Sequence, residues 1–374
     1  MISMSVPDTA ALTLEEIEHL SPNRIKQLPT ILDIVEYIST IENRQMREDL
    51  KMEYDWLKMN QEGKYMPVSD QPRTNIVKFF PCSQSTFTFM RGQNAYHRPC
   101  YPSIFRETDI DAGDYWLISR LRACEFILTF LNHPIVNEVK MNCKVEDMAI
   151  AQHYEIPTEY LDLTNNKWVA AFFAATYKEG NRYLPTKTGY DKGVGVVYIY
   201  RPQMHNPNQF DKISTLGFQY FERPTRQSSF VYKMEKGEDF DSNPRYIRLV
   251  FRHDTKASEM IYEMAYEQER FYPNDEWAEI ASQIKRNDYP LSRGSIVLSR
   301  QYGVNIPEEE IRQILTRNNI SLTDQYQPLA HLTYEQYADD IRRWNEYDRP
   351  NINRRILPPI PVMDFSPERI HKSK

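Results

Sequence analysis

A stretch in the middle of the sequence, MAIAQHYEIPTEYLDLTNNKWVAAFFAATY (148–177), gathers side chains that could do chemistry beside an apolar helix. His153 ends an expected short helix, and Asp162 and Thr164 precede a run apolar enough to be buried. The start of such a helix favours an anion, because its N–H groups are free and its dipole end is positive. A histidine and a carboxylate there could orient a ligand or move a proton. In the structural alternative, Thr164 caps the helix, Asp162 occupies a turn and His153 packs in the core.

Arg91 follows an expected strand, STFTFMRGQ (85–93), and directly precedes Gly92. Phe87 and Phe89 alternate as on one face of a strand, and Gly92 is expected to interrupt it. A guanidinium at a strand end, beside a glycine that lets a ligand approach, could hold a phosphate or carboxylate with two hydrogen bonds. The structural alternative is an arginine that pairs with an acid.

A third polar group lies between aromatic residues in FERPTRQSSF (221–230). The polar residues of this segment could supply a second set of donors for an anionic or amide-bearing ligand: Arg223, Arg226, Gln227, Ser228 and Ser229. The alternative is an exposed loop. Further on, FYPND (271–275) indicates packing at a turn, and Asp275 and Glu276 suit the first turn of a helix.

The segments that must position these residues alternate between expected strands and helices. Between residues 76 and 303, strand-like runs such as GVGVVYIYR (193–201) and YIRLVFRH (246–253) accompany helical patterns such as DYWLISRLRACEFILTFLNHP (114–134). We therefore expect an α+β core over 76–303, with a mixed, mostly antiparallel sheet flanked by helices.

Helical patterns also flank this core. Residues 1–75 are expected to form a helical N-terminal extension, in which Thr13 and Glu16 fit a capping box. Residues 304–374 are expected to form a helical appendage that begins after Pro307 and ends in a proline-rich arm. These helical ends could contact a protein partner.

Composition excludes several classes of protein. The net charge of −6 disfavours nucleic-acid binding driven by phosphate contacts. Neither GxxxxGK[ST] nor GxGxxG occurs, and the four cysteines form no CxxC pair or zinc motif, so no metal is expected. The sequence shows no secretion signal and no apolar run of the roughly 20 residues that a membrane helix needs. We expect a cytoplasmic protein without a membrane partner.

The motifs taken in order resemble the FRG domain family, which is named for an aromatic-Arg-Gly motif. The matching segments run from residue 86 to 284: MRGQ (90–93), YPSIFRE (101–107), Glu125, AQHYEIPTEYLDLT (151–164), AAFFAA (170–175), RPTRQSSF (223–230) and FYPND (271–275). This chain departs from the family pattern at Met90, at Glu155 in place of a glycine, at Glu159 in place of a basic residue, and within QSSF. The two acids are unfavourable for an anion at that loop.

The resemblance implies site roles for Arg91, Gln93, His153, Asp162 and Thr164. An aromatic-Arg-Gly strand end is also similar to the first motif of ADP-ribosyltransferases, whose arginine holds a phosphate or ribose of NAD. That likeness implies an α+β fold of the same kind, with Arg91 on the pyrophosphate, Thr164 in the Ser/Thr motif, and Glu222 as the nearest candidate for the catalytic glutamate. Tyr154 could then stack on the nicotinamide.

Three hypotheses follow. The first is an NAD-using transferase or glycohydrolase, of the kind found in bacterial toxins and phage defence, with Arg91, His153 and Glu222 as catalytic residues. The second is a module that binds a nucleotide or another small anion without turning it over. The third and weakest is a nucleic-acid-processing enzyme that uses His153 and Asp162. The first two require Arg91, His153 and Thr164 to lie within about 15 Å of one another, in one small-ligand pocket.

Overall fold

The computed structural model describes nine segments of the chain: 4–49, 65–69, 77–81, 88–106, 110–200, 212–216, 222–243, 246–326 and 333–350. Within them, the side chains of 42–49, 65–69, 77–81 and Glu222 are not described.

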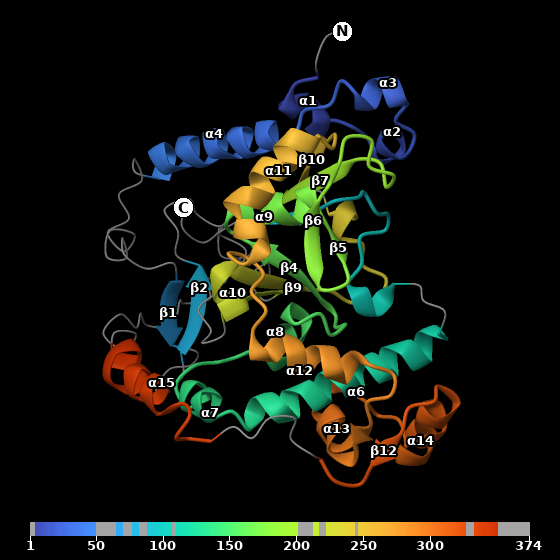
Figure 1. Ribbon diagram of the computed structural model, residues 1–374, viewed down its shortest axis with the longest axis vertical. Helices are drawn as coiled ribbons and strands as arrows, with labels where there is room; N and C mark the ends of the chain where they lie inside the picture. Colours follow the sequence, from blue (N-terminus) through green and yellow to red (C-terminus); the bar gives the residue numbers. More distant parts are fainter. Residues whose placement is uncertain are drawn as a thin grey trace, which may run out of the picture.

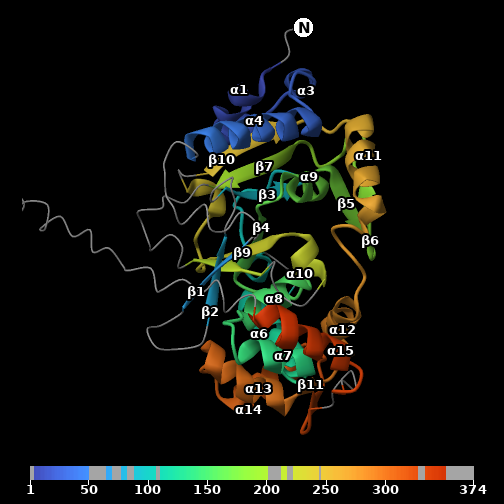
Figure 2. The same ribbon diagram turned by 90° about the vertical axis from the view of Figure 1, so that its left-hand side faces the viewer.

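A six-stranded antiparallel sheet forms the centre of the molecule (Figures 1 and 2). Its strands are β3 (Phe89–Gln93), β4 (Tyr160–Thr164), β7 (Gly195–Tyr200), β8 (Ile213–Thr215), β9 (Ser229–Lys233) and β10 (Tyr246–Phe251). Their order is β10-β7-β3-β4-β9-β8, and every neighbouring pair is antiparallel. Strands β3, β7 and β10 confirm three expected runs, although residues 85–87 of the first lie outside the described segments. Strand β4 was not expected, and it makes Asp162 a strand residue instead of a turn residue.

Helices gather at both ends of this sheet (Figure 1). One group comprises α1 (Val6–Ala10), α2 (Leu14–Glu18), α3 (Pro22–Ile25), α4 (Ile31–Asp49), α9 (Lys167–Ala175) and α11 (Thr255–Met264). The other comprises α6 (Ala112–Leu131), α7 (Pro134–Lys140), α8 (Asp147–His153), α12 (Glu276–Lys285), α13 (Arg293–Ser299) and α14 (Glu308–Arg317). The predicted α+β class, with a mostly antiparallel sheet flanked by helices, is confirmed.

Shorter elements complete the described chain. The small sheets pair β1 (Tyr65–Ser69) with β2 (Val77–Pro81), β5 (Thr176–Glu179) with β6 (Arg182–Pro185), and β11 (Leu291–Ser292) with β12 (Leu322–Thr323). The short helices are α10 (Glu222–Arg226), α15 (Ala338–Arg343), η1 (Ser103–Phe105), η3 (Phe240–Ser242), η4 (Tyr266–Gln268), η5 (Arg300–Tyr302) and η6 (Trp344–Asp348). The predicted proline-rich arm, from residue 351 onward, lies outside the described residues.

Polar side chains fix where several helices begin. The Thr13 hydroxyl accepts the Glu16 N–H and the Glu16 carboxylate accepts the Thr13 N–H, so the predicted capping box is present. Asp275 accepts the Ala278 N–H and caps α12, which confirms the acidic helix start predicted there. The N-cap of helix α9 is Asn166, whose side chain accepts the Trp168 N–H, and not Thr164.

Helix α9 lies directly against β3, and Gly92 makes that contact possible. A Cβ at Gly92 would lie 1.8 Å from the Ala170 carbonyl oxygen and 3.0 Å from the Ala174 Cβ. The expectation that Gly92 interrupts the strand is therefore wrong: the glycine lies inside β3, where it admits the backbone of a buried helix. Its place beside Arg91 couples the packing of α9 to the position of that arginine.

Among the described helices, none is both long and apolar enough to span a membrane.

Candidate functional site

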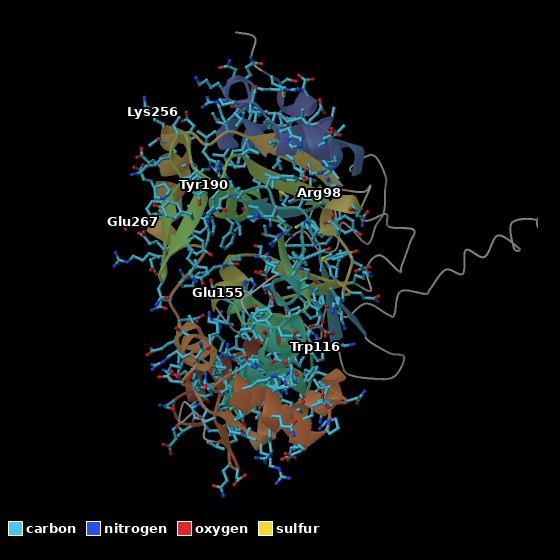
Figure 3. All side chains as sticks on the ribbon, turned by 90° about the vertical axis from the view of Figure 1, so that its right-hand side faces the viewer. Arg98, Trp116, Glu155, Tyr190, Lys256 and Glu267 are labelled. Atoms are coloured by element: carbon cyan, nitrogen blue, oxygen red, sulfur yellow. The ribbon has the colours of Figure 1, made fainter. Side chains whose placement is uncertain are left out.

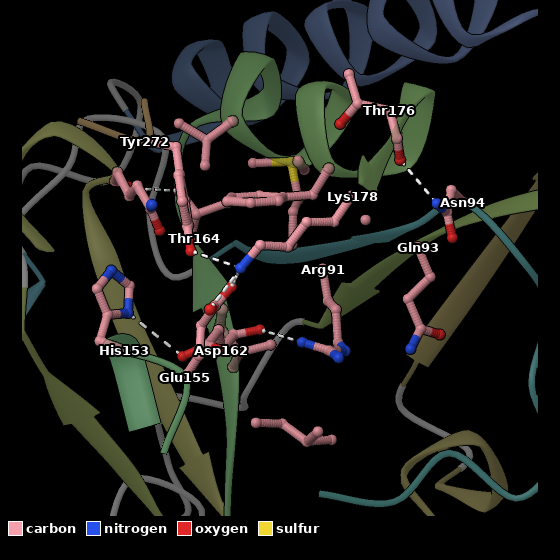
Figure 4. Close-up of a pocket in the computed structure, with 18 of the residues that line it drawn as sticks. Arg91, Gln93, Asn94, His153, Glu155, Asp162, Thr164, Thr176, Lys178 and Tyr272 are labelled. Carbon is pink, nitrogen blue, oxygen red and sulfur yellow. Dashed lines mark hydrogen bonds and ion pairs between the residues drawn. The ribbon is translucent and has the colours of Figure 1, made fainter. Parts of the chain in front are cut away.

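A cavity of about 410 Å³ opens where β3, β4 and α9 meet (Figure 4). This volume lies within the range typical of small-ligand sites. It is lined by predicted site residues from three separate segments: Arg91, Gln93, His153, Asp162, Thr164 and Gln227. The structure thus brings Arg91, His153 and Thr164 to one cavity, as both site-based hypotheses require.

Strands β3 and β4 pair only at Met90 and Thr164. Beside that pair, the Arg91 side chain extends from β3 toward β4. Past that pair, the Arg91 Nη1 donates to the main-chain oxygen of Asp162 at 3.0 Å. The Arg91 Nε is buried and has no hydrogen-bond partner within the described part of the chain. No described carboxylate forms an ion pair with Arg91, so the alternative of a structural ion pair receives no support from these residues. Buried donors are almost always satisfied, so an unused one in a cavity wall favours an acceptor from a ligand.

Two further basic side chains line the same cavity near Arg91. Arg106 follows η1, and its Nε donates to the Tyr101 carbonyl. Desolvation and the nearby Arg91 charge lower the pKa of Arg106. Desolvation, Arg106, Lys192 and Arg91 lower the pKa of His97 in the same way. The charges of Arg91 and Arg106 therefore repel each other, and a bound anion would relieve that repulsion.

Asp162 places a carboxylate in the cavity, with its side chain 39% exposed. Its Oδ1 lies 3.3 Å from His153 Nδ1, and its Oδ2 accepts from Gln152 Nε2 at 3.4 Å. On the far side of the imidazole ring, His153 Nε2 lies 3.0 Å from the Ser229 hydroxyl. Ser229 is buried and does not line the cavity. The three side chains form a chain of hydrogen bonds that runs from the core to the cavity.

The hydroxyl of Thr164 is used within the protein. It donates to the Gln227 carbonyl at 2.7 Å and accepts the Asn166 N–H at 3.0 Å. Gln227 in turn donates through Nε2 to the Phe271 carbonyl. Thr164 and Gln227 therefore join β4, α9 and the segment after η4, and both also form part of the cavity wall.

Gln93 lies beyond Arg91 on β3 (Figure 4). The side chain of Gln93 lines the cavity, and its Oε1 is 3.9 Å from the Cys100 sulfur. Next to it, the Asn94 side-chain amide donates to the Thr176 carbonyl at 2.8 Å. Gln93 is therefore an uncharged polar group at the cavity wall, suited to hydrogen bonds with a ligand.

The two acids that depart from the family pattern are both neutralised by cations of this chain. Glu155, which Figure 3 labels at mid-height of the molecule, forms two ion pairs. Its partners are Lys178 and, at 3.1 Å, Lys285. Burial opposes its ionisation, but Lys285 and Lys178 outweigh that effect and lower the pKa of Glu155 to about 2. Glu159 pairs with Arg120 at 3.0 Å. Neither acid therefore leaves unbalanced negative charge at the cavity.

Glu155 also has a left-handed backbone conformation, with φ of 64°. The family pattern has a glycine at this position, and glycine adopts that conformation without strain. This chain keeps the backbone turn while adding a carboxylate that ties α8 to β5 and α12.

Aromatic rings form another part of the wall. Phe173, Tyr183 and Tyr272 all line the cavity. The Tyr183 and Tyr272 rings are 4.8 Å apart in an edge-to-face arrangement, and Phe173 lies 5.6 Å from Tyr183. The cavity thus combines a cationic part with an aromatic part.

Two predicted residues, Tyr154 and Arg226, do not line the cavity, and the side chain of a third, Glu222, is not described. Tyr154 is 1% exposed, packs against Phe126 and donates its hydroxyl to Asp275 at 2.8 Å, so its ring is not placed to stack on a ligand there. Arg226 is exposed and donates to the Glu269 carbonyl. The backbone of Glu222 begins α10, and its side chain lies outside the described residues.

Sequence reasoning missed several residues of this wall, among them His97, Arg106 and Lys178. Arg106 could have been found, because it ends the motif segment YPSIFR. His97 and Lys178 stand in no recognisable pattern, and only the fold brings them to the cavity.

The fold and the cavity define an α+β sheet protein with a cavity lined in part by cationic and in part by aromatic side chains. The family model of the FRG domain matches residues 86–182, which run from before β3 to the start of β6 and include Arg91, His153, Asp162 and Thr164. The chain therefore carries an FRG domain, as the order of its motifs predicted. No curated protein and no solved structure matches the chain. Within the described residues, no group of three or more His, Cys, Asp or Glu side chains is arranged to hold a metal ion.

Proposed function

We propose that the cavity of the FRG domain binds an anionic nucleotide, and that NAD is the ligand of choice to test. The observation that carries the proposal is Arg91, whose buried Nε has no partner in the described chain and whose guanidinium faces the cavity beside Arg106. Two guanidinium groups without a described carboxylate partner suit a phosphate or pyrophosphate, which accepts several charge-assisted hydrogen bonds at once.

The aromatic part of the wall favours a nucleotide over inorganic phosphate. The rings of Phe173, Tyr183 and Tyr272 offer apolar surface to a base, while Gln93 offers an amide group to hydroxyl or carboxamide groups. The cavity volume of about 410 Å³ suits a ligand of this size.

Two modes of action are open to a bound NAD. In the first, the protein cleaves the bond to nicotinamide, as an ADP-ribosyltransferase-like or NAD-glycohydrolase-like enzyme. The Asp162 carboxylate favours this mode, because it is a negative group within the cavity that could stabilise a positively charged transition state. In the second, the domain senses the nucleotide without turning it over, and the Arg91 geometry alone is enough.

A thermal-shift screen of the purified protein against NAD, ADP-ribose, AMP and inorganic phosphate tests the proposal. A ligand that binds only the folded state raises the unfolding temperature. We expect NAD and ADP-ribose to raise it more than phosphate does, and Arg91→Ala to abolish both shifts.

Arg342→Ala is the matched control, because it removes an exposed arginine that does not line the cavity. Circular dichroism checks that each variant is folded. An absence of any shift with all four compounds refutes the proposal.

A further inference from the structure

We infer that Asp162 is the catalytic base of the cavity and that His153 and Ser229 are the positioning residues that hold it. The inference rests on the proposed binding of NAD, and it adds the reacting group and the source of its orientation. It also assigns a role to Ser229.

The donor and acceptor roles of Ser229, His153 and Asp162 follow from the chemistry of the carboxylate. His153 Nδ1 faces the Asp162 carboxylate, which only accepts, so the ring carries its proton on Nδ1. Nε2 is then an acceptor, and the Ser229 hydroxyl donates to it at 3.0 Å. The carboxylate therefore selects the tautomer, and the Ser229 hydroxyl, which can donate, completes the hydrogen bonds of the ring and holds the imidazole against Asp162.

The burial of the three hydrogen-bonded side chains shows which of them can meet a ligand. Ser229 is 1% exposed and the His153 side chain is 2% exposed, whereas the Asp162 side chain is 39% exposed and lines the cavity. In a serine hydrolase the order is the reverse, because the serine meets the substrate and the acid is buried. Here a serine nucleophile has no access, and the group presented to the ligand is the carboxylate.

Arg91 ties this carboxylate to the binding site. The guanidinium donates to the main-chain oxygen of the same residue, Asp162, at 3.0 Å. Both residues line the same cavity, so a phosphate held by Arg91 would share that cavity with the Asp162 carboxylate. Replacing only that side chain leaves the main-chain contact of Arg91 in place, so binding and chemistry can be separated by mutation.

The reaction that fits is hydrolysis of the bond between nicotinamide and ribose in NAD. The C1′–N bond breaks and its electron pair stays on the nicotinamide nitrogen, while the oxygen of water bonds to C1′. The Asp162 carboxylate takes the proton of that water and passes it to solvent. The products are nicotinamide, ADP-ribose and one proton, and no electron acceptor or donor is needed.

The experiment combines two measurements on the full chain: release of nicotinamide from NAD and calorimetric titration with ADP-ribose. We expect Asp162→Asn to bind ADP-ribose as the wild type does and to lose at least about 100-fold in kcat. Ser229→Ala should lose about tenfold in kcat with KM unchanged, because the ligand contacts remain and only the base is less well held.

Ser258→Ala is the control for Ser229→Ala. Ser258 is also buried and hydrogen-bonded to a side chain, Thr186, but it does not line the cavity or contact Asp162. Unfolding temperatures of both serine variants separate a general loss of stability from a loss of positioning. Equal kcat for the two variants overturns the role of Ser229.

The remaining outcomes distinguish this inference from the proposed function. If the wild type binds ADP-ribose but releases no nicotinamide, the catalytic inference is overturned and nucleotide binding stands. If Asp162→Asn keeps the wild-type kcat, Asp162 is not the base. If the wild type binds neither NAD nor ADP-ribose, the proposed function fails and this inference fails with it.

Discussion

Replacing Gly92 by alanine tests how the fold positions Arg91. The added Cβ would lie 1.8 Å from the Ala170 carbonyl oxygen, whereas real Cβ contacts essentially never fall below 3.0 Å. Strand β3 and helix α9 must therefore separate by about 1.2 Å, and because the obstacle is backbone, no side-chain rotation can relieve it. Overpacking of this kind costs about 1–3 kcal/mol or more, and we expect Gly92→Ala to lie at or above the upper end.

The assay is urea unfolding followed by circular dichroism, with Gly294→Ala as the matched control. A Cβ at Gly294 would meet mainly the end of the flexible Leu128 side chain, and Gly294 is helical, where alanine is favoured by about 1 kcal/mol. If Gly92→Ala changes the free energy of unfolding by less than about 0.5 kcal/mol, the close approach of α9 to β3 is not as described. A folded Gly92→Ala protein should also bind ADP-ribose more weakly, because Arg91 is displaced with the strand.

Three further predictions concern other described residues. Tyr154→Phe should lower the free energy of unfolding by about 1 kcal/mol, because the hydrogen bond from the hydroxyl to Asp275 is lost. Calorimetry should find its nucleotide affinity unchanged, since the ring does not line the cavity. A large loss of affinity would contradict this position of the ring. Glu155→Gln should cost about 1–2 kcal/mol in urea unfolding, because its two lysine partners lose their carboxylate; an unchanged midpoint would show that these ion pairs contribute nothing. Burial lowers the pKa of His253 from 6.5 to about 4, so protonation favours the unfolded state. The free energy of unfolding should therefore be greatest above pH 6.5 and fall by up to roughly 3 kcal/mol as the pH falls toward 4. His253→Asn should reduce that pH dependence.

Periodicity and capping in the sequence predicted several elements correctly. Alternation of side chains predicted strands β3 and β7. Cap residues predicted where two helices begin: Asp275 caps α12 and Thr13 caps α2. Both signals act locally. Strand β4 was missed although Leu161 and Leu163 alternate with polar neighbours. The nearby proline and the following apolar helix made a turn the simpler interpretation.

The remaining differences depend on contacts between segments far apart in the sequence. The role of Gly92 is set by α9, about 80 residues later, which no local pattern reveals. His153 and Tyr154 are neighbours at the end of α8, yet adjacent helical residues point in different directions, so the histidine reaches the cavity and the tyrosine reaches the core. Ser229 comes to His153 only because β9 pairs with β4.

Calorimetric titration of ADP-ribose into wild-type protein, Arg91→Ala and Arg342→Ala tests the central claim most directly. We predict saturable binding to the wild type and to Arg342→Ala, and affinity at least about tenfold weaker for Arg91→Ala, as expected for the loss of charge-assisted hydrogen bonds worth about 1.5–3 kcal/mol. Equal affinity for wild type and a folded Arg91→Ala would contradict the assignment of this cavity as the nucleotide site.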